Sequence, residues 1–187
     1  MFCENHVGLC LLGQTQVESE LLDNDNFNAW LRETIYSLIE AEYCSRFIIG
    51  ALNQFEMAFI RTLFGSVLLD DKIISRLKRG EGSVDFLLCL AEGEPIDYIA
   101  DATKMTIEDF LPVPFRLPLT ISPYCIPGDR RNKMYEMIDL SDFMVCHVAN
   151  DASADDYYFL EYAKAAAIPV RNWFDSYDHS IKRGDTR

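Results

Sequence analysis

The stretch SDFMVCHVA, residues Ser141–Ala149, decides the fold because two polar residues give way to a nearly continuous apolar run. Such a run is typical of a parallel strand that is covered on both faces. Turn-forming and helix-capping residues follow at Asn150–Asp156, and helix formers at Tyr157–Ala167. Ile168–Phe174 supplies a second strand. The sequence therefore predicts a βαβ unit, whose right-handed crossover places the loop at the carboxyl edge of a parallel sheet, beside the helix N-terminus.

The preceding chain repeats this alternation of strand and helix. Apolar runs predict strands at Val7–Gly13, Cys44–Gly50 and Val84–Leu90, and a weaker, edge-like strand at Phe115–Ile121, where Pro118 lacks an N–H. Helical spacing of apolar residues predicts a helix capped by Asn28, one after Gln54, one with Leu69, Ile73, Ile74 and Leu77 on one side, and one over Arg130–Leu140. Residues Ala91–Pro114 are interpreted as a loop with one helical turn near Thr106–Asp109. We expect an α/β, Rossmann-like three-layer sandwich with a mostly parallel sheet, one domain over residues 1–174, and a polar tail over 175–187.

Composition limits the classes of partner. The 187 residues can bury roughly 70% of their unfolded surface, which is enough for one core without disulfides or metal. A formal net charge of −13 argues against binding to nucleic acid or to an anionic membrane. The six cysteines have no CxxC spacing and are interpreted as reduced core thiols, and the three histidines have no metal-ligand spacing. Without a signal peptide or an apolar run of ~20 residues, the protein is expected to be cytoplasmic.

Several segments carry a resemblance to a known family. Phe47–Glu56 (FIIGALNQFE) resembles the second-strand motif of the YpsA-like branch of the SLOG superfamily, in which a strand ends in glycines and Phe-Asp follows. Met137–Val145, Phe159–Lys164 and Ile168–Val170 resemble the last third of the same family, and Cys10–Thr15 is similar to its first strand and Gly-His-Arg turn. The resemblance implies a Rossmann-like fold with a pocket for a nucleotide or nucleotide-derived ligand. Its relatives include the Lonely Guy phosphoribohydrolases and the DNA-processing protein A group.

The chain departs from this pattern where the family binds phosphate. Ala154-Asp155-Asp156 stands in place of a glycine pair, and Gln14-Thr15 in place of His-Arg. A helix N-terminus favours an anion by about 0.3–2 kcal/mol, whereas a carboxylate ~4 Å from a phosphate charge repels it by about 4 kcal/mol at an effective dielectric constant of 20. If both aspartates face the pocket, repulsion outweighs the dipole. Measured against the family pattern, these departures indicate an eroded phosphate-binding loop.

The candidate ligand-binding residues lie at the expected carboxyl edge. They are Gly13, Gln14, Thr15, Gly50, Asn53, Gln54, Glu56, Arg130, Arg131, Asn132, Asn150, Asp151, Asp155 and Asp156. The aspartates have a second interpretation as acids that cap their own helix, while a pocket role would involve Mg²⁺ bound with a nucleotide. The basic cluster at Arg130–Lys133 either binds a phosphate or forms a solvated first turn.

Three functions remain open on these residues. The first is a non-catalytic binding module for a nucleotide-derived ligand that signals through a homo-oligomer or a protein partner. The second is a nucleotide N-glycosidic hydrolase, in which the Lonely Guy resemblance implies that Glu161 or Glu56 polarises the ribose or activates water; Glu161 is also interpretable as a solvated helix residue. The third is a protein without a ligand, whose acidic surface binds a basic partner. The binding module is the preferred hypothesis.

Overall fold

The computed structural model describes residues 7–13, 24–50, 53–80, 82–110, 117–149 and 152–175, without the side chains of Ile96 and Thr106. Its strands are β1 (Val7–Gly13), β2 (Cys44–Ile49), β3 (Val84–Ala91), β4 (Leu119–Ile126), β5 (Phe143–His147) and β6 (Val170–Asn172). Its α-helices are α1 (Asp25–Glu42), α2 (Gln54–Gly65), α3 (Asp71–Arg79), α4 (Ile96–Phe110), α5 (Arg130–Asp139) and α6 (Ala154–Ala165), and a 3₁₀ helix, η2 (Val67–Leu69), follows α2.

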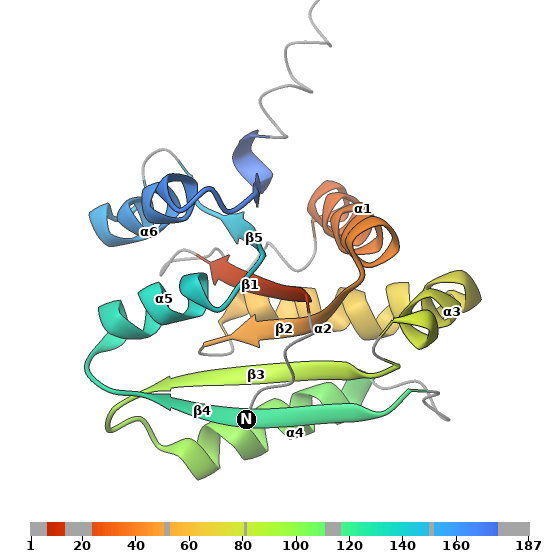
Figure 1. Ribbon diagram of the computed structural model, residues 1–187, viewed down its shortest axis with the longest axis horizontal. Helices are drawn as coiled ribbons and strands as arrows, with labels where there is room; N and C mark the ends of the chain where they lie inside the picture. The colour runs from red at the N-terminus through yellow and green to blue at the C-terminus, as the bar shows by residue number, and fades with distance from the viewer. Residues whose placement is uncertain are drawn as a thin grey trace, which may run out of the picture.

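The six strands form one parallel sheet in the order β4-β3-β2-β1-β5-β6 (Figure 1). The chain builds outward from β1 to β4 and then returns through α5 to β5, on the other side of β1. The strand order therefore reverses between β1 and β5, the position at which open α/β sheets bind ligands outside their carboxyl ends. The predicted α/β, Rossmann-like sandwich is confirmed.

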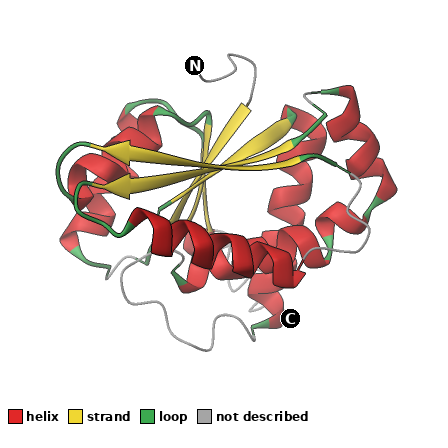
Figure 2. Ribbon diagram, turned by 90° about the horizontal axis from the view of Figure 1, so that it is seen from below, coloured by secondary structure: helices red, strands yellow, loops and turns green. Residues whose placement is uncertain are grey.

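Helices flank the twisted sheet (Figure 2). Residues of α1, α2, α3 and α4 pack with one face of the sheet, and residues of α5 and α6 pack with the other. Right-handed crossovers produce this division, because the reversal of direction after β4 moves the following helices to the opposite face. Strand β1 serves both cores, since Leu9 and Leu11 belong to the first and Cys10 and Leu12 to the second.

Phenylalanines fill the space between the sheet and α2. Phe47 of β2 has its ring centroid 5.3 Å from that of Phe59 in α2 and 5.4 Å from that of Phe86 in β3. Phe64, five residues beyond Phe59 on α2, stacks on Phe86 at 5.9 Å. All four rings are buried, so the attachment of α2, which opens next to the carboxyl edge, depends on this cluster.

The prediction for residues 91–114 was wrong, because α4 occupies Ile96–Phe110. Apolar or small side chains at Ile99, Thr103 and Ile107 recur every four residues and form the inner face of α4. Thr103 is fully buried, and its Oγ1 is satisfied by a 2.7 Å hydrogen bond that it donates to the carbonyl of Ile99. The acidic residues lie on the exposed face, and their density in the sequence hid the helical period.

Three element boundaries also differ from the prediction. Helix α1 is capped by Asn24 instead of Asn28, because the Asn24 side chain accepts from the N–H of Phe27 and the added turn buries Phe27. Leu69 lies in η2 and is 54% exposed, so it does not belong to the apolar face of α3. Strand β4 starts after Pro118 and continues through Pro123, which an edge strand tolerates.

Four of the five cysteines within the described ranges, Cys10, Cys44, Cys89 and Cys146, are buried free thiols, and Cys125 is exposed. Burial raises the pKa of the Cys89 thiol to about 12. Buried neutral thiols of this kind pack as small apolar side chains. Over the same ranges, every helix is too short or too polar to cross a membrane.

Phe59→Ala should lower the free energy of unfolding by about 3–5 kcal/mol, because it leaves a buried cavity beside the ring of Phe47. Tyr98→Ala is the matched control, since Tyr98 is 74% exposed on α4 and its loss should change stability by no more than about 0.5 kcal/mol. Urea unfolding followed by circular dichroism measures both. A loss below about 1 kcal/mol for Phe59→Ala would contradict this account of the core.

Candidate functional site

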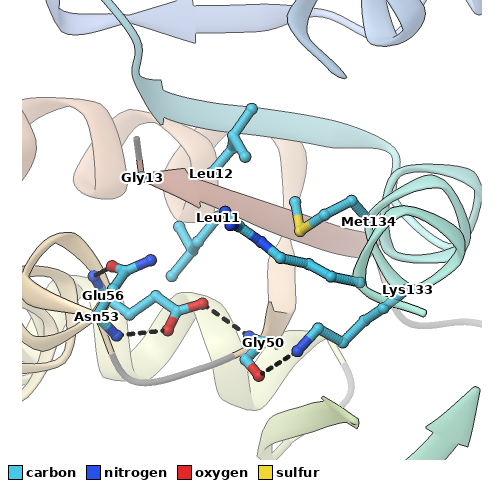
Figure 3. A pocket seen from close by; sticks show the side chains of 9 residues that line it. Leu11, Leu12, Gly13, Gly50, Asn53, Glu56, Lys133 and Met134 are labelled. Atoms are coloured by element: carbon cyan, nitrogen blue, oxygen red, sulfur yellow. Dashed lines mark hydrogen bonds between the residues drawn. The ribbon is translucent and has the colours of Figure 1, made fainter. Parts of the chain in front are cut away.

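A small cleft opens at the carboxyl ends of β1 and β2, beneath the first turn of α5. It measures about 40 Å³, which is space for roughly three water molecules. Its lining comprises Leu11, Leu12, Gly13, Gly50, Asn53, Glu56, Arg130, Lys133 and Met134 (Figure 3). Three separate parts of the chain therefore meet at the edge where the fold is expected to bind a ligand.

The Glu56 carboxylate fixes the turn between β2 and α2. Its Oε1 accepts a 2.7 Å hydrogen bond from the N–H of Gly50, and its Oε2 accepts a 3.0 Å bond from the N–H of Asn53. The Asn53 side chain in turn accepts from the N–H of Glu56 at 2.9 Å, which completes a capping box at the start of α2. Glu56 is 2% exposed, so its charge is stabilised by these N–H groups in place of water.

Gly13 allows the N-terminus of α2 to pack against the end of β1. A Cβ at Gly13 would lie 2.7 Å from the Cβ of Phe55 and 3.0 Å from the Oδ1 of Asn53. Gly50 is also closely packed, since a Cβ there would lie 3.1 Å from the sulfur of Met137. The contact at Gly13 thus needs glycine, whereas the flexible Met137 side chain at Gly50 has room to shift.

Lys133 connects α5 to two strand exits. Its ammonium donates to the carbonyl of Gly50 at 3.2 Å and to both carboxylate oxygens of Glu94 at 2.8 and 2.9 Å. Glu94 also accepts a 2.6 Å hydrogen bond from the N–H of Ala91, at the end of β3. Lys133 is 3% exposed, so its charge is compensated within the protein and supports the wall of the cleft.

The two arginines that open α5 face the two aspartates that open α6. Arg131 donates to Asp155 at 2.6 Å in an exposed pair. Arg130 lines the cleft and lies 3.7 Å from a carboxylate oxygen of Asp156, whose side chain is buried. Asp156 also accepts a 2.7 Å hydrogen bond from Ser153, the residue that caps α6. The acids therefore serve their own helix and pair with α5, as first-turn acids do.

Five of the predicted site residues line the cleft: Gly13, Gly50, Asn53, Glu56 and Arg130. Five others, Gln54, Arg131, Asn132, Asp155 and Asp156, lie on the adjoining first turns without lining it. Gln14, Thr15, Asn150 and Asp151 fall outside the described residues. Glu161 lies on the exposed face of α6 and pairs with Lys164 at 3.0 Å.

The candidate list omitted four residues of the lining: Leu11, Leu12, Lys133 and Met134. Lys133 had been named only as part of the basic cluster, although residues three apart on a helix share a face and Arg130 was already a candidate. Leu11 and Leu12 gave only the signal of a buried strand. Their place in the cleft follows only from the packing of α2 and α5 on opposite faces of β1.

His147 ends β5 beside the cleft strand β1, where it pairs in register with Gly13. Its ring centroid lies 4.8 Å from that of Phe174, 5.7 Å from that of Phe27 and 6.2 Å from that of Phe55. His147 is 6% exposed, and its Nδ1 has no hydrogen-bond partner among the residues that the structure describes. Burial among these rings lowers the pKa of His147 below its ordinary value of 6.5.

The described residues contain no group of three or more His, Cys, Asp or Glu side chains placed to hold a metal ion. No family model matches the chain, and no curated protein matches it at a significant level. The geometry of the cleft is therefore the basis for assigning a function.

Gly13→Ala should destabilise the protein by about 1–3 kcal/mol, because the new methyl group would overlap Phe55 at the start of α2. Gly65→Ala is the matched control. A Cβ at Gly65, the last residue of α2, meets no atom within 4 Å, so this variant should be unchanged or stabilised by about 0.4–1 kcal/mol. Thermal unfolding compares the two, and equal effects would contradict the close approach at Gly13.

His147 should make stability depend on pH below its ordinary pKa of 6.5. The unfolded chain binds a proton there while the folded chain resists it, so stability falls as pH drops from 6.5 toward the lower folded-state pKa, by at most about 1.4 kcal/mol per pH unit. Well above pH 6.5, His147 is neutral in both the folded and the unfolded chain and no longer makes stability depend on pH. Denaturant unfolding from pH 7 to pH 5 should show a shallower loss of stability in His147→Leu than in the unaltered protein. Identical pH dependence in the two proteins would rule out a neutral, buried His147.

Proposed function

We propose that this protein is a non-catalytic binding module for a nucleotide or nucleotide-derived ligand. The observation that carries the proposal is the glycine-lined cleft at the carboxyl ends of β1 and β2, next to the reversal of strand order between β1 and β5. Rossmann-like folds hold nucleotides at this place because loop backbones and helix N-termini converge there. A cleft of about 40 Å³ suits one small group, such as a phosphate, with the rest of the ligand across its mouth.

Arg130 is the cation that we assign to the ligand. It lines the cleft from the first turn of α5, and its side chain is 53% exposed. An arginine can donate two parallel hydrogen bonds to a phosphate, and a helix N-terminus adds a favourable dipole. Asp156 opposes this role, because its carboxylate lies 3.7 Å from the Arg130 guanidinium and competes with an anionic ligand. We therefore expect modest affinity, which agrees with an eroded phosphate-binding loop.

The resemblance of Phe47–Glu56 to the YpsA-like branch of the SLOG superfamily adds support. In that motif a strand ends in glycines, and here Gly50 and Asn53 stand at the cleft. We propose kinship with this branch on these residues and on the order of the later segments. The departures at Gln14-Thr15 and at Asp155-Asp156 place the chain at a distance from members with an intact phosphate site.

The carboxylates argue for binding over hydrolysis. A general base needs an oxygen that can reach a water or hydroxyl in the site. Both oxygens of Glu56 accept backbone N–H groups, and Glu161 pairs with Lys164 on the exposed face of α6. Glu161 therefore lies outside the cleft, and the two backbone hydrogen bonds of the Glu56 carboxylate give it a structural role at the β2–α2 turn.

A ligand screen tests the proposal directly. AMP, cyclic AMP, NAD and ADP-ribose should be added to the purified protein, and at least one should raise the melting temperature in a concentration-dependent way. Adenosine is the control without phosphate and should have a smaller effect. A flat response to all compounds, together with a native mass equal to that of the chain alone, would contradict the proposal and favour a ligand-free interaction protein.

Side-chain variants then locate the binding site. Arg130→Gln should weaken binding of the best phosphorylated compound by about tenfold or more, because a charge-assisted hydrogen bond is lost. Asp156→Asn should strengthen binding several-fold by removing a competing charge and keeping the side-chain shape. Asp155→Asn is the matched control, since Asp155 pairs with Arg131 away from the cleft, and calorimetry should show a smaller change. Equal affinities in all four proteins would place the ligand elsewhere.

A further inference from the structure

A second hollow lies at the opposite edge of the sheet. It measures about 180 Å³ and is lined by Glu40, Lys72, Arg76 and Arg79, from the end of α1 and along α3. These two helix ends lead directly into β2 and β3, so the hollow lies at the amino ends of the strands. Figure 1 shows α1 and α3 side by side, away from the arrowheads that mark the carboxyl edge. The cleft described above is therefore a separate site.

The residues that line this hollow carry a net positive charge, whereas the chain as a whole is negatively charged. Three of its four lining residues are cations and one is a carboxylate, whereas the whole chain has a formal net charge of −13. Glu40 forms a salt bridge with Lys72. The hydrogen bond to Glu40 and the negative charge of Glu40 raise the pKa of Lys72, so this lysine is protonated at neutral pH. Among the lining residues, two arginines then remain without a carboxylate opposite them.

Arg76 is held in place by an aromatic ring. Its guanidinium carbon lies 3.3 Å from the centre of the Tyr43 ring, a close cation–π stack. Tyr43 ends α1 in the left-handed conformation, with φ 59°, and its partly exposed ring lies near Gly80. Stacking occupies the face of the guanidinium and leaves its N–H groups in the plane for an anion. The stack on Tyr43 thus positions the Arg76 guanidinium before a ligand binds.

The guanidinium groups of Arg76 and Arg79 make few polar contacts with the residues that the structure describes. Neither Arg76 nor Arg79 forms a salt bridge with a residue that the structure describes. The Nε of Arg76 is buried and has no hydrogen-bond partner there, while that of Arg79 donates to the carbonyl of Ser75 at 3.3 Å. A buried N–H without an acceptor is uncommon in folded proteins, and an anion in the hollow would bind the other N–H groups of the Arg76 guanidinium.

Basic residues in the last turn of α3 also have an ordinary role, since they complement the helix dipole. That role accounts for the sign of the charges. It requires neither a hollow between the cations nor a guanidinium stacked on a tyrosine. The combination is what a site for a multivalent anion needs: converging donors, a positive local field and room for the ligand.

We propose that Lys72, Arg76 and Arg79 form a binding site for a phosphate-bearing small molecule, with Arg76 as its fixed, forked donor. Arg79 and Lys72 supply further positive charge at the rim. Binding should weaken as salt is added, because the site is open to solvent and its charges are screened.

Calorimetric titration of the full chain with inorganic pyrophosphate at low salt tests the proposal. We expect saturable binding that Arg76→Gln weakens by about tenfold or more, and that Arg76→Lys restores only in part because lysine lacks the planar fork. Arg130→Gln separates the two sites, since it should remove only the pyrophosphate that binds in the carboxyl-edge cleft. Loss of binding in Arg130→Gln but not in Arg76→Gln would assign the pyrophosphate to the cleft and overturn this proposal.

A second measurement keeps the proposal testable if Arg76→Gln loses its fold. Pyrophosphate added to the unaltered protein should shift the backbone amide resonances of Arg76–Gly80 and Tyr43 in NMR spectra, with the same midpoint as the calorimetric titration. Lys104→Gln controls for non-specific charge, since Lys104 is an exposed cation on α4. Equal weakening by Lys104→Gln and Arg76→Gln, or resonances that do not move, would exclude a site at α3.

Discussion

The carboxyl edge of this protein depends on one buried carboxylate. Glu56 accepts the N–H groups of Gly50 and Asn53, and this pair of bonds fixes both the end of β2 and the start of α2. With the turn fixed, the Asn53 side chain and Phe55 pack against Gly13 at the end of β1. Lys133 then reaches the carbonyl of Gly50 from α5 and closes the far wall. An unpaired carboxylate at this depth would be costly, so the backbone conformation and the charge stabilise each other.

The charged residues at the two edges of the sheet differ in how they are paired. At the carboxyl edge most charges are used internally, since Lys133 pairs with Glu94 and Arg130 approaches Asp156. At the amino edge the cations of α3 outnumber the carboxylates that face them. In a parallel sheet all strand exits lie at one edge and all entries at the other, so the two groups of charges lie far apart. The proposed nucleotide cleft and the proposed anion site can thus be altered by mutation independently of each other.

The sequence predicted the fold where hydrophobic pattern alone decides structure. The runs that form β1, β2, β3 and β5 are apolar enough to indicate strands buried on both faces. It failed for α4, whose period is carried by few apolar residues among many acids. For the cleft, glycines at strand exits and the Asn53 cap were visible locally. The contact between Glu94 and Lys133 joins positions 39 apart and follows only from the packing of α5. Motifs likewise could not tell whether Asp156 faces a ligand or its own helix cap.

Amide hydrogen exchange in Glu56→Ala tests the central role of Glu56 most directly. The account predicts that the N–H groups of Gly50 and Asn53 exchange at least about tenfold faster in this variant than in the unaltered protein. The strand amides of Phe47–Ile49 should remain protected and show that the sheet persists. Unchanged exchange at Gly50 and Asn53 would contradict the claim that the Glu56 carboxylate holds this edge of the sheet in place.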